Sequence, residues 1–240
     1  MNICSRVVFT VLLLIAASTF VGAQRTTNPV VVEDASSSAE ESSKTPFSDC
    51  YAYRLKRGDN EIAFWSSFSF KATTIFSGLH KDEAADRKFF MAAFRYGRTL
   101  AANEHLALQY TLDAIPIAVA TGVVVARSKV GGVTTFQRET AYGAGVTPAA
   151  LQLDFANGSK VHPFIHVNGG LLVFNKPVPI EDSGRFAFVG EAGGGLRIFT
   201  SERRAVTLGI MFHHISNGNI ARANRGLNQF VVYAGFSLFK

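Results

Sequence analysis

From residue 60 onward, apolar residues alternate with small or polar residues and do not recur at helical spacing. A period of two puts successive side chains on opposite faces, which is typical of β-strands. In the first such segment, 62–70, Ile62, Phe64, Phe68 and Phe70 alternate with small residues. The pattern recurs and predicts an all-β chain of eight strands: 62–70, 89–100, 106–118, 140–155, 161–175, 185–200, 206–217 and 229–239.

The connections between these segments alternate between short and long. The short ones are 101–105, 156–160 and 201–205, and the long ones are 73–88, 122–139, 176–184 and 218–228. Tight turns at one end and longer loops at the other are typical of outer-membrane barrels, which have an even number of strands. The sequence therefore predicts an eight-stranded antiparallel up-and-down transmembrane β-barrel.

Each predicted strand has one apolar face and one face that carries polar candidates. In 106–114 the face with Leu106, Leu108 and Leu112 is opposite the face with Gln109 and Asp113. An eight-stranded barrel is packed with side chains, so the polar face is expected to form an internal network. Four of its members have side chains that can bind metals, but their spacing follows no ligand pattern, and we expect an internal network and no metal: Asp113, His162, His166 and Glu191.

The alternative fold is a soluble secreted β-sandwich, which would use the same alternation. A sandwich explains neither the regular loop lengths nor outward faces this apolar on every strand. The last segment resembles the C-terminal strand of outer-membrane proteins, although Lys240 follows the aromatic Phe239.

The first 23 residues have a basic start, the apolar run 7–17 and a small-residue site at 21–23. These features predict a signal peptide at 1–23 and an exported protein without a transmembrane helix. Residues 24–48 are rich in Ser, Thr and Glu, which predicts a disordered leader before a barrel domain at 49–240. The mature chain keeps only Cys50, so it forms no internal disulfide.

The formal net charge of +6 falls to +5 after cleavage, because the signal peptide holds Arg6 and no acidic residue. An exported basic protein without a basic-aromatic cluster is unsuited to nucleic acid. Lipopolysaccharide or anionic phospholipid is the expected partner.

His214 and Ser216 lie two residues apart and so share a face with the apolar Leu208, Ile210 and Phe212. If the leader begins in the periplasm, the seventh strand ends at the external rim, where this face meets lipid. An imidazole beside a hydroxyl at that depth suits an enzyme that works on lipid acyl chains. His213 has the opposite parity and should point into the barrel without a catalytic role.

The segment 214–217, followed by 224–228 and a last strand, resembles the PagL-type lipid A 3-O-deacylases. The resemblance implies an outer-membrane serine esterase that removes the 3-position acyl chain of lipid A. It assigns Ser216 as nucleophile and His214 as base. It also assigns Asn224 to the oxyanion hole, together with a backbone N–H for which Gly218 is the candidate.

The chain departs from the family at Asn228. At this position the family has a glutamate, which is the third member of its catalytic triad. An amide can hold the histidine in one tautomer, but it cannot stabilise imidazolium by charge. The loop 218–226 has no acidic residue, and Glu202 belongs to the opposite turn. Arg222 and Arg225 in this loop either meet lipid phosphates or are simply solvated.

The sequence thus predicts a lipid A deacylase without cofactor in the bacterial outer membrane, acting on lipopolysaccharide of the outer leaflet. The alternatives are a non-catalytic barrel with a structural or adhesion role, which Asn228 favours, and a small soluble lipid-binding barrel. The acyl position and whether the protein forms a homodimer stay open.

Overall fold

The computed structural model describes residues 53–76, 86–124, 129–130, 133–134 and 137–240. The predicted signal peptide, the leader and Cys50 lie outside these ranges. None of the described residues forms a helix long and apolar enough to cross a membrane.

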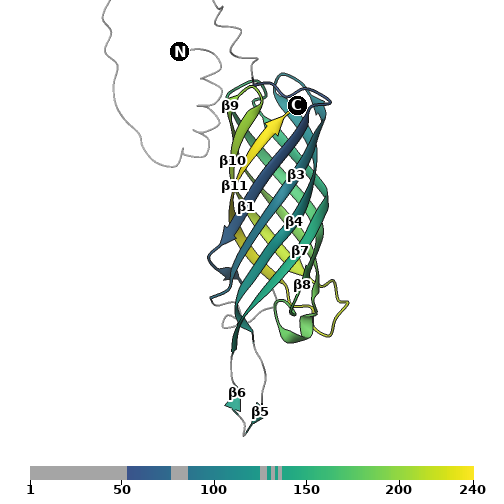
Figure 1. Cartoon of the computed structure of the whole chain (residues 1–240), viewed down its shortest axis with the longest axis vertical. Coiled ribbons are helices and arrows are strands. Elements are labelled where there is room, and N and C mark those ends of the chain that lie inside the picture. The colour runs from purple at the N-terminus through teal and green to yellow at the C-terminus, as the bar shows by residue number, and fades with distance from the viewer. Residues whose placement is uncertain (1–52, 77–85, 125–128, 131–132, 135–136) are drawn as a thin grey trace, which may run out of the picture.

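Eight long antiparallel strands form one closed barrel (Figure 1). Each strand pairs with its neighbour in the chain, and β1 also pairs with β11, so that Ile62 lies opposite Leu238. Closure confirms the predicted barrel and excludes the β-sandwich. The strands are β1 (Asn60–Ser69), β3 (Lys88–Ala102), β4 (Leu106–Val124), β7 (Gln137–Phe155), β8 (Val161–Phe174), β9 (Phe186–Ser201), β10 (Arg204–Ser216) and β11 (Leu227–Phe239).

Short elements lie at the long-loop end. They are the strands β2 (Ala72–Thr73), β5 (Lys129–Val130) and β6 (Val133–Thr134), and the 3-10 helix η1 (Glu181–Ser183). The turns after β3, β7 and β9 lie at the other end together with the C-terminus (Figure 1). The predicted alternation of loop lengths is therefore confirmed.

One predicted loop is wrong in its bounds. The sequence predicted a loop over 122–139, but β4 and β7 stay paired through Gly122 and Glu139 to Val124 and Gln137. The backbone ladder continues there, whereas the alternation of apolar residues stops. A hairpin that has left the lipid needs no apolar face, so the period-two signal disappears before the strands do.

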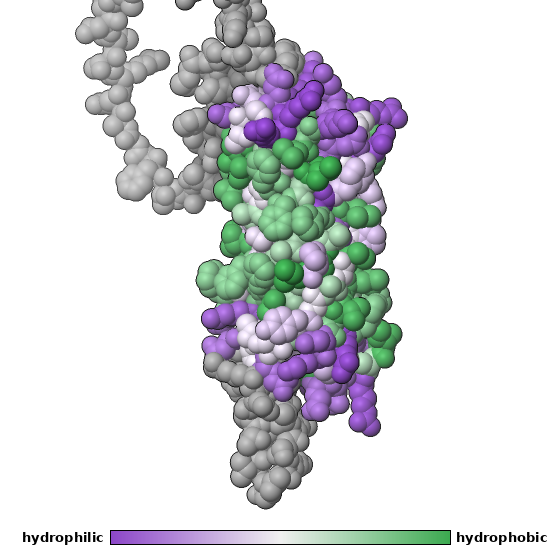
Figure 2. All heavy atoms as spheres, in the orientation of Figure 1, coloured by the Kyte–Doolittle hydropathy of each residue, from purple (hydrophilic) through white to green (hydrophobic). Residues whose placement is uncertain are grey.

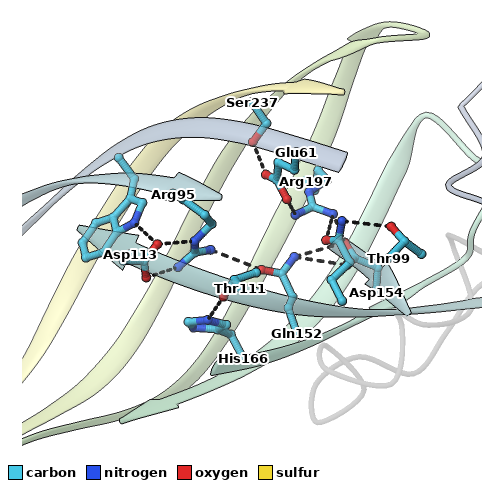
Figure 3. A network of polar contacts seen from close by, with 12 residues as sticks. Glu61, Arg95, Thr99, Thr111, Asp113, Gln152, Asp154, His166, Arg197 and Ser237 are labelled. Atoms are coloured by element: carbon cyan, nitrogen blue, oxygen red, sulfur yellow. Dashed lines mark hydrogen bonds and ion pairs between the residues drawn. The ribbon is translucent and has the colours of Figure 1, made fainter. Parts of the chain in front are cut away.

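A network of buried charges and amides lies inside the barrel, as the parity predicted, beside a cluster of buried apolar side chains (Figure 3). Arg95 Nε donates to Asp113 Oδ1 at 2.7 Å, and Trp65 Nε1 donates to the same oxygen at 3.1 Å. Arg197 donates to Glu61 at 3.0 Å and to Asp154 at 2.9 Å. The described residues contain no group of three or more His, Cys, Asp or Glu suited to a metal ion.

The outward face of every long strand carries exposed apolar side chains. Ile62, Phe94, Val167, Ile210 and Phe230 are each about half exposed or more. The visible face in Figure 2 shows a hydrophobic band between two hydrophilic ends. Such a band matches the hydrocarbon layer of a bilayer, which solvates apolar side chains that water would not.

Replacing Asp113 by Ala should destabilise the barrel by about 3–5 kcal/mol, because the Arg95 guanidinium would stay buried without its partner. Urea unfolding in detergent micelles measures the change. The matched control is Glu104→Ala, whose exposed carboxylate lies 3.9 Å from Arg54 at the short-turn end and should cost less than about 1 kcal/mol. Equal losses of unfolding free energy in the two variants would contradict the view that the buried network stabilises the barrel.

Candidate active site

His214 and Ser216 end strand β10 at the long-loop end and face the outside of the barrel. Both side chains are half-buried, whereas the neighbouring His213 and Ile215 of the same strand are fully buried. The predicted parity is therefore confirmed, including the inward direction of His213. Earlier on the same face of the strand, Ile210 is 57% exposed and belongs to the apolar band. His214 and Ser216 lie beyond it, at the rim of that band.

Asn228 on β11 lies directly across the strand pair from His214. Its Oδ1 is hydrogen-bonded to His214 Nδ1. Because an amide oxygen only accepts, the proton in this bond belongs to Nδ1. In the neutral ring the other nitrogen, Nε2, then carries no proton and can accept one from a hydroxyl such as that of Ser216.

The Nδ2 end of the Asn228 amide contacts the segment after β1, for which the sequence predicts a loop over 73–88. Strand β2 pairs with β11, so that Thr73 lies opposite Asn228, and Asn228 Nδ2 donates to the backbone carbonyl of Ile75. This cover leaves Asn228 buried although its position on β11 faces outward. The alternation of apolar residues does not predict β2, because this strand is only two residues long.

Asn224 lies in the loop between β10 and β11 and is exposed. Its Oδ1 accepts a hydrogen bond from the backbone N–H of Asn217 at 3.1 Å. The amide is thereby oriented with its two Nδ2 donors directed away from Asn217. The Asn217 N–H is engaged in this bond, so it is not the backbone donor of an oxyanion hole.

Gly218, the predicted backbone donor, has a φ of 61° and is exposed. This left-handed conformation favours glycine, and a Cβ here would lie 2.8 Å from the ring of Phe188. Both reasons make the turn after Ser216 specific for glycine. They keep the backbone, and not a side chain, at the surface next to the pair.

Asn217 has a role that the sequence analysis missed. Its side chain is 3% exposed and donates to the carbonyls of Ser183 and Ala223, each at 2.7 Å, while its Oδ1 accepts from the N–H of Asn219 at 3.0 Å. Asn217 thus ties the loop after Ser216 to itself and to η1. An Asn before a Gly at a strand end is a turn signal that indicates such side-chain bonding.

Among the described residues, no carboxylate is hydrogen-bonded to His214. Glu191 faces the inside of the barrel, where its Oε1 lies 2.6 Å from Nδ1 of His213. Glu202 lies in the turn between β9 and β10, at the far end of the barrel, as predicted. Arg222 is exposed and Arg225 half-buried in the loop that carries Asn224.

Comparison with solved structures gives weak likenesses to outer-membrane proteins. The outer membrane enzyme PagL is 14% identical over 74% of this chain and 97% of its own, with a TM-score of 0.42. The outer membrane protein OprG from Pseudomonas aeruginosa is 12% identical over 78% and 98%, with a TM-score of 0.45. Neisserial surface protein A is 13% identical over 75% and 96%, with a TM-score of 0.41. No curated protein matches the chain.

The match that decides the family is one to a family model. The model of the lipid A 3-O-deacylase (PagL) family matches residues 100–237, which is more than half of the chain and includes β10, β11 and the loop between them. Lipid A is therefore the substrate, and the soluble and non-catalytic alternatives lose their support. The chain belongs to the PagL family of lipid A 3-O-deacylases and is an ester hydrolase built as an outer-membrane β-barrel.

Proposed function

We propose that this deacylase uses Ser216 as nucleophile, His214 as base and Asn228 to orient His214. The observation that carries the proposal is the hydrogen bond from His214 Nδ1 to Asn228 Oδ1. In the neutral ring this bond leaves Nε2 free to accept a proton, on the same outward face of β10 as Ser216. The same three-part logic of nucleophile, base and orienting group serves serine hydrolases of unrelated folds.

The reaction begins when Ser216 Oγ attacks the carbonyl carbon of the acyl ester and its proton passes to His214 Nε2. The resulting oxyanion is stabilised by Asn224 Nδ2 and the backbone N–H of Gly218. Collapse of this intermediate expels the sugar alkoxide, which takes the proton from His214. Water then repeats the sequence on the acyl-enzyme, releasing the fatty acid and restoring Ser216.

Asn228 differs from a carboxylate in one respect that affects the rate. It fixes the tautomer of His214, but it brings no negative charge to stabilise the imidazolium that forms during attack. We therefore expect turnover to be slower than a carboxylate at the same place would permit. The four proposed side chains come from one chain: Ser216, His214, Asn228 and Asn224. The proposal therefore does not require a homodimer.

A row of small residues on the outer surface begins beside His214 and suits an acyl chain. Cross-strand neighbours follow in the order His214, Gly190, Gly169 and Ala149, on β10, β9, β8 and β7. No described heavy atom lies within 4 Å of the position that a Cβ of Gly190 would take. Three strand spacings of about 4.8 Å make this path about 14 Å long.

The far end of the row is a hollow on the lipid-facing surface, lined by Tyr110, Ala149, Leu151 and Val167 among others. His214 lies two residues from the long-loop end of β10, whereas Ala149 lies six residues from the short-turn end of β7. The path thus runs from the rim into the apolar band. We infer that it receives the acyl chain whose ester lies at Ser216.

Ser216→Ala and His214→Ala should each lower the release of the 3-hydroxyacyl chain by about a thousandfold or more, because the nucleophile or its base is lost. Mass spectrometry of lipid A from vesicles measures the release, and heat-modifiable mobility reports the folded barrel. Ser201→Ala and His105→Ala at the opposite end are the matched controls. Full activity in either site variant would refute the assignment.

Asn224→Ala should lower kcat by about 10²–10³, because one oxyanion donor is lost. Asn224→Asp separates two explanations, since it keeps the oxygen that accepts from Asn217 N–H and removes the Nδ2 donor. We expect the Asp variant to be at least as inactive as the Ala variant. Retained activity in Asn224→Asp would mean that Asn224 only holds the loop.

Gly190→Leu should lower kcat/KM for lipid A by about 10- to 200-fold, because the new side chain occupies the acyl path. A soluble acetyl ester, which does not reach the path, should be hydrolysed at the wild-type rate. Ala114→Leu, on the outward face of β4, is the control for adding bulk to the barrel surface. An equal loss on both esters would show that Gly190 does not select the acyl chain.

A further inference from the structure

An amide at position 228 raises a problem of orientation that a carboxylate does not have. Both oxygens of a carboxylate accept hydrogen bonds, so either can face His214. An amide has a donor end and an acceptor end. If Asn228 were turned over, Nδ2 would donate to His214 Nδ1 and the ring proton would move to Nε2, which could then take no proton from Ser216.

The structure holds the Asn228 amide in the productive orientation. Nδ2 donates to the Ile75 carbonyl on one side, and Oδ1 accepts from His214 Nδ1 on the other. Turning the amide over would place Oδ1 against the Ile75 carbonyl, which is acceptor against acceptor. Asn228 is fully buried, so water cannot relieve that contact.

A one-residue bulge brings Ile75 to this place. Phe68 on β1 lies opposite Val232, whereas Thr73 on β2 lies opposite Asn228, so the β1–β2 side contains one residue more than β11 between these pairs. An extra residue reverses which side chains face outward. Odd-numbered residues point inward along β1, but after the bulge Ala72 is buried and Ile75 is exposed.

Thr73 then fixes the turn that presents the Ile75 carbonyl. Its Oγ1 accepts a hydrogen bond from the Ile75 backbone N–H at 3.2 Å, the pattern of a Ser/Thr turn. Because Thr73 is also the cross-strand neighbour of Asn228, the turn closes directly over the amide.

We propose that residues 73–75 act as a positioning element that locks the Asn228 amide and so allows it to replace the carboxylate of the triad. The proposal rests on the proposed roles of Ser216, His214 and Asn228. Thr73 and Ile75 do not touch substrate; they act on the tautomer of His214 through Asn228. A carboxylate at 228 would not need the lock and would face the Ile75 carbonyl with an oxygen.

A double-mutant cycle between positions 73 and 228 tests the lock. Thr73→Val removes the acceptor oxygen at nearly constant volume and should lower kcat about tenfold or more, because part of the His214 population takes the wrong tautomer. In an Asn228→Asp background the same change should alter kcat less than about twofold, since either carboxylate oxygen can face His214. Equal losses in both backgrounds, or no loss in either, would overturn the proposal.

Two further variants complete the kinetic set. Thr73→Ser keeps the acceptor oxygen and should restore most of the rate lost in Thr73→Val. Thr200→Val removes a hydroxyl that bonds the Arg204 carbonyl at the short-turn end, and it should leave kcat unchanged. Failure of the serine variant to restore the rate would show that Thr73 acts by its shape and not by its oxygen.

The tautomer itself is a readout that does not need turnover. Nitrogen-15 NMR of labelled barrel in micelles should show His214 protonated on Nδ1 in the wild type and a share protonated on Nε2 in Thr73→Val. A wild-type spectrum in Thr73→Val would overturn the lock. If this shift appears while Ser216→Ala keeps full activity, the lock stands and the proposed mechanism fails, so the two failures are distinguishable.

Discussion

Backbone pairing across the seam between β1 and β11 is the interaction on which this structure depends. In lipid, an unpaired N–H or carbonyl has no water to bond, so the sheet is stable only as a closed barrel. Closure gives every residue an inside or an outside position, and the membrane makes the outside apolar. A polar side chain on the outside is tolerated only where a strand leaves the hydrocarbon layer. His214 and Ser216 occupy such positions at the end of β10.

The seam also explains why the site has a buried member. β1 follows β11 as far as Phe68, and the bulge then turns the chain so that β2 covers the outward face at Asn228. Inside the same wall, His213 is bonded to Glu191 and stacked on Phe89 at 4.7 Å between ring centres. The strand that carries His214 is therefore held from within by the hydrogen-bonded pair His213 and Glu191, and from the neighbouring strand by Asn228. Rigid support on both sides suits the role of base that we propose for His214.

The period of two made most of the fold and part of the site predictable. Alternation alone identified eight strands, the inward His213 and the outward His214, because lipid and packed interior impose opposite demands on successive residues. Alternation did not predict the ends of β4 and β7, since their hairpin continues beyond the lipid, where apolar side chains are not required. Alternation did not predict the contact of Ile75 with Asn228 either, because a bulge shifts the register by one residue. The hydrogen bonds of Asn217 were not predicted because bonds from a side chain to backbone carbonyls produce no periodic pattern.

Replacing a triad carboxylate by an amide exchanges one physical requirement for another. A carboxylate stabilises imidazolium from either oxygen and needs no orientation, but it must be kept charged at the edge of a low-dielectric layer, where desolvation opposes the ionised form. An amide carries no charge to desolvate, yet it works in one orientation only and needs a fixed partner behind it. The Ile75 carbonyl is such a partner, and it faces the Nδ2 donor that only an amide offers. In the proposed triad, the bulge in the β1–β2 segment and the amide on β11 are thus parts of one arrangement, which orients His214 without supplying the negative charge of a carboxylate.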